Sequence, residues 1–295
     1  MARCALPVTR TAFAGTALAV RVSGLVGGHS GTEIHKGRAN ACMVLGRVLQ
    51  AMGAETELRL VTAAGGGKDN AIPMESSAQV VASDETAARQ AAEQMAAALT
   101  REYAVADPGL RVEVTACEVS ETPMDRASTE KALCMLTCLP NGIQAMSMDI
   151  PGLVQTSLNL GILATEADSL TATFCVRSSL GSQKEMLHRR LRALMAQLGG
   201  TVSISGDYPA WEYRQDSPLR DLMTEIFWEQ YGNAPQIEAI HAGVECGILA
   251  GKLPGLDCVS VGPDLLDIHT PRERMDIASV QRVWRFVLEV LKRSK

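Results

Sequence analysis

Several features are missing from this sequence of 295 residues, and each absence excludes a class of protein. No apolar run approaches the roughly 20 residues that a membrane-spanning helix needs. Lys and Arg number 28 against 33 Asp and Glu, with the signs interspersed, so no basic stripe is present for nucleic acid or an anionic membrane. The eight cysteines form no Cys-x-x-Cys pair, which is typical of a reduced protein. We therefore expect a cytoplasmic protein without nucleic-acid or membrane partners.

Three common catalytic or nucleotide-binding motifs are absent as well. A serine nucleophile elbow needs Gly-x-Ser-x-Gly, but residues 28–32 read GHSGT and lack the final glycine. A Walker loop that includes Gly67-Lys68 needs a glycine at position 62, where the sequence has Thr62. It also needs Ser or Thr at position 69, where the sequence has Asp69. No Gly-x-Gly-x-x-Gly opens a helix. The sequence therefore indicates neither a serine hydrolase nor a nucleotide-binding enzyme.

The spacing of apolar residues up to residue 206 predicts an α+β layer, with helices packed on antiparallel strands in two successive rounds. The expected strands are 16–24, 56–63, 70–81, 111–119, 143–149, 156–164, 169–178 and 201–206. The expected helices run from Ile34 to Met52, from a cap at Asp84 to Tyr103, and over 127–139 and 182–198.

The last 90 residues have a different pattern. Helices are expected near 218–231, which starts at a Ser-Pro pair, and near 277–293. Two short apolar segments between them, 236–240 and 256–261, predict strands of a parallel α/β sheet. Two strands are too few for such a sheet, because both of its faces must be covered. We expect this region to be an incomplete portion of a larger domain.

The stretch GLVGGHSGTEIH (24–35) places His29 on a turn flanked by glycines. Ser30 and Glu33 have the Ser-x-x-Glu spacing of a capping box, which predicts a helix start at Ser30. The helix dipole disfavours the imidazolium there, so a neutral His29 could donate a hydrogen bond to a substrate. The residue could equally cap or pack within the turn, and the motif alone does not separate these alternatives.

Two further histidines lie near the expected strands of the last 90 residues. AIHAGVECGIL (239–249) carries His241 and Glu245 at the carboxyl end of a strand, where open α/β sheets bind ligands. His269 lies in the loop before the final helix. Either stretch could instead be a surface loop, because a metal site needs several His or carboxylate ligands.

Five stretches together resemble one family, the aminoacyl-histidine dipeptidases. They are GGHSGTEIHKGRANA (27–41), NAIP (70–73), QTSLNLG (155–161), HAGVECG (241–247) and GPDLLDIHTP (262–271). This family belongs to the di-zinc metallopeptidases that include carnosinases, aminoacylases and glutamate carboxypeptidases.

The resemblance implies a division of the chain into three parts. Residues 1–14 would be a remnant of an upstream catalytic segment, and residues 15–206 an α+β lid, or dimerisation, domain. Residues 207–295 would be the C-terminal part of the α/β zinc-peptidase catalytic domain, with an incomplete parallel sheet.

The resemblance also implies roles for single residues. His29 would reach the active site of the other subunit and stabilise the tetrahedral oxyanion, and His269 would be the last zinc ligand. Substrate-binding roles are implied for His241, Gly243, Glu245, Arg177, Asn159 and Asn70. Of these, Arg177 would hold a substrate carboxylate, although it could instead be a surface arginine at the end of a strand.

The sequence departs from this family in its metal ligands. The upstream half of such a site carries a His-x-Asp pair, a bridging Asp and an adjacent Glu-Glu pair. Here no histidine is followed two residues later by Asp, and no two glutamates are adjacent. One ligand at His269 cannot hold two zinc ions, and no general base is present to activate water. We therefore expect a truncated enzyme that is inactive by itself.

Two functions remain open from the sequence alone. The first is that of a homodimeric zinc dipeptidase, in which water attacks the peptide carbonyl of Xaa-His and other dipeptides between two zinc ions. The second is that of a non-catalytic dimerisation or binding remnant of such an enzyme.

Overall fold

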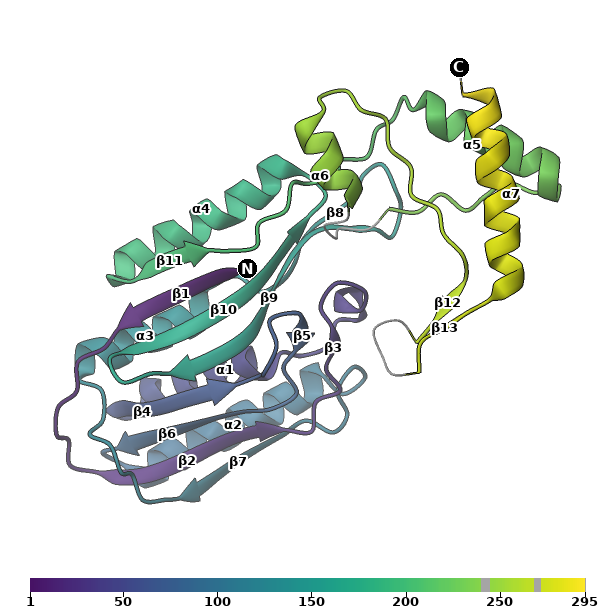
Figure 1. Ribbon diagram of the computed structural model, residues 1–295. Helices are drawn as coiled ribbons and strands as arrows, with labels where there is room; N and C mark the ends of the chain where they lie inside the picture. The colour runs from purple at the N-terminus through teal and green to yellow at the C-terminus, as the bar shows by residue number, and fades with distance from the viewer. Residues whose placement is uncertain (240–244, 268–271, 295) are drawn as a thin grey trace. The chain divides into compact units, whose positions relative to one another are not determined.

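The computed structural model describes residues 1–239, 245–267 and 272–294. The chain divides into two compact units, Met1–Asp207 and Tyr208–Lys295 (Figure 1).

The first unit is built on a nine-stranded antiparallel sheet, as the α+β prediction requires. Its order is β11-β1-β10-β9-β4-β6-β2-β7, with β8 paired to β9. The strands are β1 (Ala2–Pro7), β2 (Thr16–Ser23), β4 (Leu58–Gly65), β6 (Ser76–Ala82), β7 (Arg111–Ala116), β8 (Gly142–Met146), β9 (Val154–Thr165), β10 (Ser169–Ser178) and β11 (Thr201–Ile204). Two shorter strands, β3 (Gly28–His29) and β5 (Ala71–Ile72), pair with each other outside this sheet.

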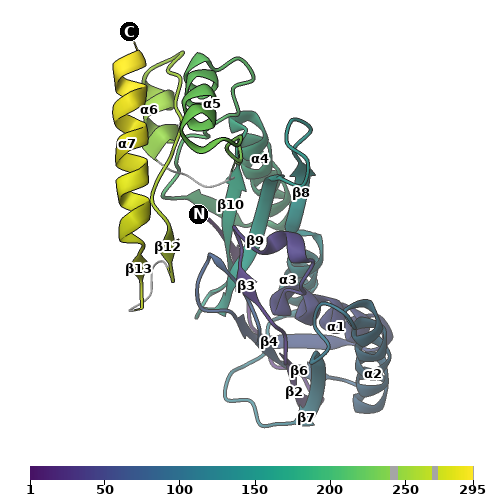
Figure 2. The ribbon, with the colours of Figure 1, turned by 90° about the vertical axis from the view of Figure 1, so that its right-hand side faces the viewer.

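Four helices cover one face of the sheet (Figure 2). They are α1 (Ala41–Glu55), α2 (Glu85–Glu102), α3 (Arg126–Cys138) and α4 (Gly181–Leu198). α1 and α2 pack together, while α4 packs on β1, β10 and β11. The sheet has two halves that meet where β4 and β9 pair at Gly65 and Leu163. The two predicted rounds of helix and strand therefore form one continuous layer with a single apolar core.

The N-terminal residues correct one prediction. We expected residues 1–14 to belong to a different domain from residues 15–206. Instead β1 pairs antiparallel with both β10 and β11, inside the sheet of the first unit. The side chains of Ala2, Cys4 and Leu6 are fully buried, so this segment contributes to the core of that unit.

The predicted start of the first long helix was also wrong. Only a short 3-10 turn, η1 (Ile34–Lys36), follows Ser30, and it ends at Gly37 with φ +66°. The helix begins at Ala41, after Asn40, whose Oδ1 accepts hydrogen bonds from the backbone N–H groups of Cys42 and Met43. A left-handed residue terminates helical hydrogen bonding, so the cap had to lie beyond Gly37.

The second unit contains three helices and a two-stranded antiparallel ribbon in its described part. The elements are α5 (Pro218–Tyr231), α6 (Glu245–Lys252), β12 (Leu265–Leu266), β13 (Arg274–Met275) and α7 (Ile277–Arg293). The Ser-Pro start is confirmed, because Ser217 Oγ accepts a hydrogen bond from the N–H of Arg220.

The two parallel strands predicted for this unit are not present among its described residues. Residues 236–239 and 256–261 belong to no helix or strand, and residue 240 lies outside the described part. A strand exists only where a neighbour completes its hydrogen bonds, and apolar composition alone does not supply one.

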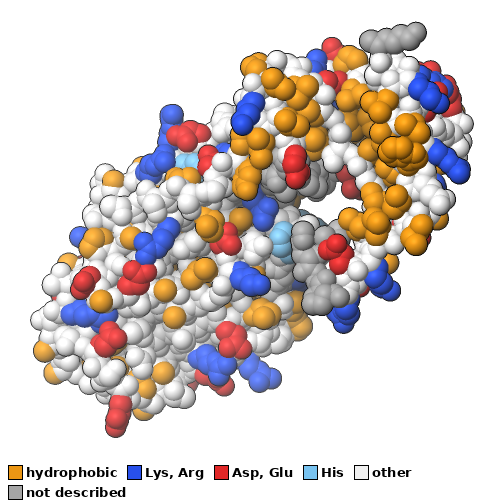
Figure 3. All heavy atoms as spheres, in the orientation of Figure 1, with side chains coloured by type: hydrophobic (Ala, Val, Ile, Leu, Met, Phe, Trp, Pro, Cys, Tyr) orange, Lys and Arg blue, Asp and Glu red, His pale blue; other side chains and the backbone are white. Residues whose placement is uncertain are grey.

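The second unit buries little apolar surface for its content of large apolar residues. Its core consists of Met223, Ile226, Phe286 and Val290 with four partly buried neighbours. Hydrophobic side chains gather over its surface (Figure 3), including Trp228 at 58% and Trp284 at 63% exposure. Among the described residues, no helix combines the length and the apolar character needed to cross a bilayer.

Candidate functional site

The short ribbon of β3 and β5 presents His29. Gly28 pairs with Ile72 and His29 with Ala71. Gly27 and Gly28 have φ values of +66° and +137°, which side-chain-bearing residues rarely adopt. These glycines therefore let the chain leave β2 and turn His29 outward.

The ring of His29 is held in one orientation by its own turn. Its Nδ1 lies 3.2 Å from the backbone nitrogens of both Gly31 and Thr32, which donate hydrogen bonds to it. A ring nitrogen that accepts hydrogen bonds carries no proton, so the neutral ring has its proton on Nε2. The turn thus prepares His29 as a hydrogen-bond donor through Nε2.

Glu33 stabilises the backbone of this turn. Its Oε2 accepts a hydrogen bond from the backbone N–H of His29 at 2.9 Å. Lys36 and Arg38 form ion pairs with its Oε1 at 2.7 and 3.2 Å. The hydrogen bond from Lys36, followed by that from the His29 backbone, lowers the pKa of Glu33 to about 2. Glu33 is therefore a carboxylate throughout the neutral range, and it binds the backbone of His29 rather than capping a helix with Ser30.

Arg177 lies beside His29, although the two residues are far apart in the sequence. A methyl group on Gly31 would lie 2.9 Å from His29 Cε1 and 3.2 Å from Arg177 Cζ. Arg177 is near the end of β10, and within the described residues its guanidinium has no hydrogen-bond or ion-pair partner. A half-buried cation without a partner favours binding of an anion.

The two asparagines singled out from the sequence differ in their surroundings. The carbonyl oxygen of Asn70 accepts a hydrogen bond from Ser30 N–H at 2.9 Å, so Asn70 adjoins the turn that carries His29. Asn159 is 1% exposed, and its amide hydrogen-bonds to other residues of the chain. These contacts do not support the prediction that Asn159 binds substrate directly.

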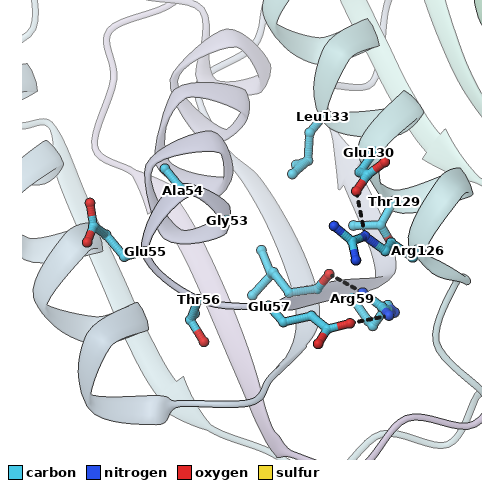
Figure 4. Close-up of a pocket in the computed structure, with 11 residues that line it drawn as sticks. Gly53, Ala54, Glu55, Thr56, Glu57, Arg59, Arg126, Thr129, Glu130 and Leu133 are labelled. Carbon is cyan, nitrogen blue, oxygen red and sulfur yellow. Dashed lines mark hydrogen bonds and ion pairs between the residues drawn. The ribbon is translucent and has the colours of Figure 1, made fainter.

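A separate hollow lies between the C-terminal end of α1, the start of β4 and α3. It has a volume of about 390 Å³ and contains none of the residues predicted to form the site. Figure 4 shows four of its charged side chains joined in two pairs, Arg59 with Glu57 and Arg126 with Glu130, while Glu55 lies apart from them. Because these charges compensate one another, the hollow indicates no particular ligand.

Comparisons with known proteins agree with the resemblance found in the sequence. A family profile described as the peptidase dimerisation domain matches residues 20–107. The "Cytosol non-specific dipeptidase" of Escherichia coli (strain K12) is 32% identical over 273 residues, which are 92% of this chain and 56% of that protein. The crystal structure of aminoacylhistidine dipeptidase from Vibrio alginolyticus superimposes with a TM-score of 0.92 at 30% identity, covering 99% of this chain and 60% of that one.

The chain is thus similar to these two dipeptidases in sequence and in structure, and residues 20–107 match the peptidase dimerisation domain. It spans a little more than half of the length of each of these two relatives. The matched residues begin within β2 and include the turn of His29, α1 and β5.

The remaining predicted site residues belong to the second unit. Glu245 is the first residue of α6 and is exposed. His241, Gly243 and His269 lie outside the described residues. Within the described parts of the chain, no three His, Cys, Asp or Glu side chains are grouped as a metal ion would require.

Sequence reasoning missed three residues that shape the site. Gly31 was noted only as part of a motif. Its lack of a side chain lets His29 and Arg177 approach each other. The spacing of Glu33 suggested a helix cap, and Asn40 was not predicted to have a role. The Asn-Ala pair at 40–41, before an apolar-periodic segment, was a usable cap signal.

Proposed function

We propose that this chain provides the lid, the dimer contact and part of the substrate site of a dipeptidase. The observation that carries the proposal is the approach of Arg177 to His29 over Gly31. One cation without a partner and one neutral donor, side by side, suit the terminal carboxylate and the peptide carbonyl oxygen of a short peptide substrate.

Each residue has a defined task in this proposal. The guanidinium of Arg177 binds the terminal carboxylate of the dipeptide through paired hydrogen bonds. Nε2–H of His29 donates to the peptide carbonyl oxygen and to the oxyanion that forms from it. Asn70 adjoins the same turn and contacts the substrate, and substrate-binding roles are also proposed for Glu245, His241 and Gly243. The substrates in this proposal are Xaa-His and other dipeptides.

Most ligands of the metal site would have to come from outside this chain. In the proposed function His269 contributes one ligand, and two zinc ions would supply the activated water. The sequence offers no His-x-Asp pair and no adjacent glutamates to complete that site. We therefore expect the 295-residue chain to hydrolyse no dipeptide when zinc or manganese is added.

The proposal extends to assembly and location. Two copies associate through the dimerisation domain, with a two-fold contact as the commonest arrangement, and His29 acts in the site of the partner. Residues 207–295 belong to a catalytic domain, which is supported by the large apolar residues that the second unit exposes. The protein acts in the cytoplasm, as the name of the Escherichia coli relative states for that protein.

A second candidate function is dimerisation without catalysis. It is favoured by one observation, the match of residues 20–107 to a dimerisation domain. In that case Arg177 and His29 would bind a peptide carboxylate without turnover.

Joining the chain to the part of the Escherichia coli dipeptidase that it does not cover separates the two candidates. We expect this joined protein to hydrolyse Xaa-His dipeptides and the 295-residue chain to remain at the blank rate. A folded, zinc-loaded joined protein without hydrolysis would favour the non-catalytic function. Turnover by the 295-residue chain, purified free of other peptidases, would contradict the proposed absence of a metal site.

A further inference from the structure

Three asparagines form a hydrogen-bonded cluster between the start of α1 and β9. Asn40 Nδ2 donates to Leu160 O at 2.8 Å, to Asn159 Oδ1 at 3.2 Å and to Asn141 Oδ1 at 3.5 Å. Asn141 Oδ1 also accepts from Leu160 N–H at 2.8 Å. Asn40 and Asn159 are 5% and 1% exposed, so their amide groups are shielded from water. Buried amides of this kind remain in place only when they are hydrogen-bonded.

Asn159 extends this cluster to the loop before β5. Its Nδ2 donates to the carbonyl oxygens of Asp69 at 3.0 Å and Ala71 at 2.8 Å. One side chain therefore binds the backbone on both sides of Asn70. Its Oδ1 is held by Asn40, which is fixed in turn as the cap of α1.

The same loop packs directly on β9 at Gly161. A methyl group on Gly161 would lie 2.5 Å from Asp69 Cα and 2.6 Å from Lys68 O. Contacts this short leave no room for a side chain at position 161. Asn159 and Gly161, two residues apart on the strand, thus form a platform for the loop.

The loop in turn determines where the His29 turn lies. Ala71 pairs with His29 in the β5–β3 ribbon, and Asn70 O accepts the hydrogen bond from Ser30 N–H. The side-chain amide of Asn159 donates both of its N–H groups to the backbone of this loop. Any effect of Asn159 on His29 must therefore be transmitted by the loop.

We propose that Asn159, held by Asn40, is a positioning residue that fixes the orientation of His29 through the loop at 66–71. The proposed function supplies the reason why the orientation of His29 matters, and the proposal rests on it in that respect. The orientation itself is measurable without any hydrolysis. This role differs from direct substrate binding, because the side-chain amide of Asn159 is hydrogen-bonded to Asn40, Asp69 and Ala71.

Asn159→Asp tests this proposal in the full 295-residue chain. Aspartate keeps the acceptor for Asn40 but loses the two N–H donors that bind Asp69 and Ala71. The readout is the imidazole ¹⁵N spectrum of His29, assigned by its loss in His29→Gln. We expect one Nε2–H tautomer in the wild-type chain and a mixture of tautomers in the variant. Amide hydrogen exchange at Ser30 should accelerate by about tenfold or more, because its acceptor becomes mobile.

A second variant displaces the loop without removing a hydrogen bond. Gly161→Ala should push Asp69 away from β9 and produce the same change in the His29 spectrum. Asn141→Ala is the matched control, since Asn141 belongs to the cluster but, among the described residues, forms its hydrogen bonds with Asn40, Gln144 and Leu160 and none with the loop. It should lower stability while leaving the His29 tautomer unchanged. His188, which is buried in α4, serves as an internal reference within each spectrum.

An unchanged His29 spectrum in folded Asn159→Asp and Gly161→Ala chains would overturn the proposal. An equal change in Asn141→Ala would overturn it as well, because the effect would then be general loosening of the fold. Failure of the proposed function is distinguishable, since it would leave these spectra as expected while His29→Ala has no effect on turnover in the joined protein.

Discussion

His29→Ala in the joined protein is expected to lower kcat by roughly 10²–10³, with a much smaller change in KM. The reason is that a donor aimed at the developing oxyanion acts mainly in the transition state. The turn holds Nδ1 as an acceptor, so the neutral ring carries its proton on Nε2 without a rearrangement. Steady-state hydrolysis of an Xaa-His dipeptide at saturating zinc measures the change.

His35→Ala is the matched control for this variant. His35 lies on η1, six residues from His29, and is exposed. Its replacement should leave kcat within about twofold of wild type, as for a surface position without a role. Equal losses in the two variants would show that the turn tolerates no change, and an unaffected kcat in His29→Ala would contradict the assignment.

Arg177→Ala is expected to act on KM instead. A hydrogen bond to a charged group contributes about 1.5–3 kcal/mol, so KM should rise by roughly 10- to 100-fold. Arg177→Lys should recover only part of the loss, because lysine cannot form the paired hydrogen bonds of a guanidinium. The measurement compares a dipeptide with its C-terminal amide, which has no carboxylate.

The amide substrate makes this prediction specific. Wild-type enzyme should already bind the amide weakly, and Arg177→Ala should then change its KM little. Arg3 lies on β1 and forms an exposed ion pair with Glu166. Arg3→Ala should therefore leave KM unchanged for both substrates. A similar rise of KM for dipeptide and amide would show that Arg177 does not recognise the carboxylate.

Much of the first unit could be predicted from the sequence, because its strands and helices have clear apolar periods. The strand 169–178 was predicted with the bounds that the structure has, and the cap at Asp84 was also correct. The segment 70–81 was predicted as one strand and forms two, β5 and β6. Pro73 lies between them, and it has no N–H to continue the pairing.

The remaining errors arise from partners that are distant in the sequence. Ala2, Cys4 and Leu6 alternate with other residues as in a strand. The hydrogen-bonding partners of β1 are β10 and β11, however, which lie more than 160 residues away in the sequence. The approach of His29 to Arg177 has the same origin, since it joins β3 to β10. The strands expected in the second unit depended on apolar composition, which does not specify a hydrogen-bonding neighbour.

The central claim is that His29 belongs to a dipeptidase site of the partner subunit, and mixing two inactive variants of the joined protein tests it most directly. One variant carries His29→Ala and the other His269→Ala. In a mixed dimer, the subunit with intact His269 receives intact His29 from its partner, so one of its two sites is complete.

Random re-pairing of equal amounts makes about half of the dimers mixed, and we therefore predict recovery of about a quarter of wild-type hydrolysis. If mixed dimers form, as shown by differently tagged subunits, and hydrolysis stays at the level of the separate variants, His29 does not act across the dimer and the account is contradicted.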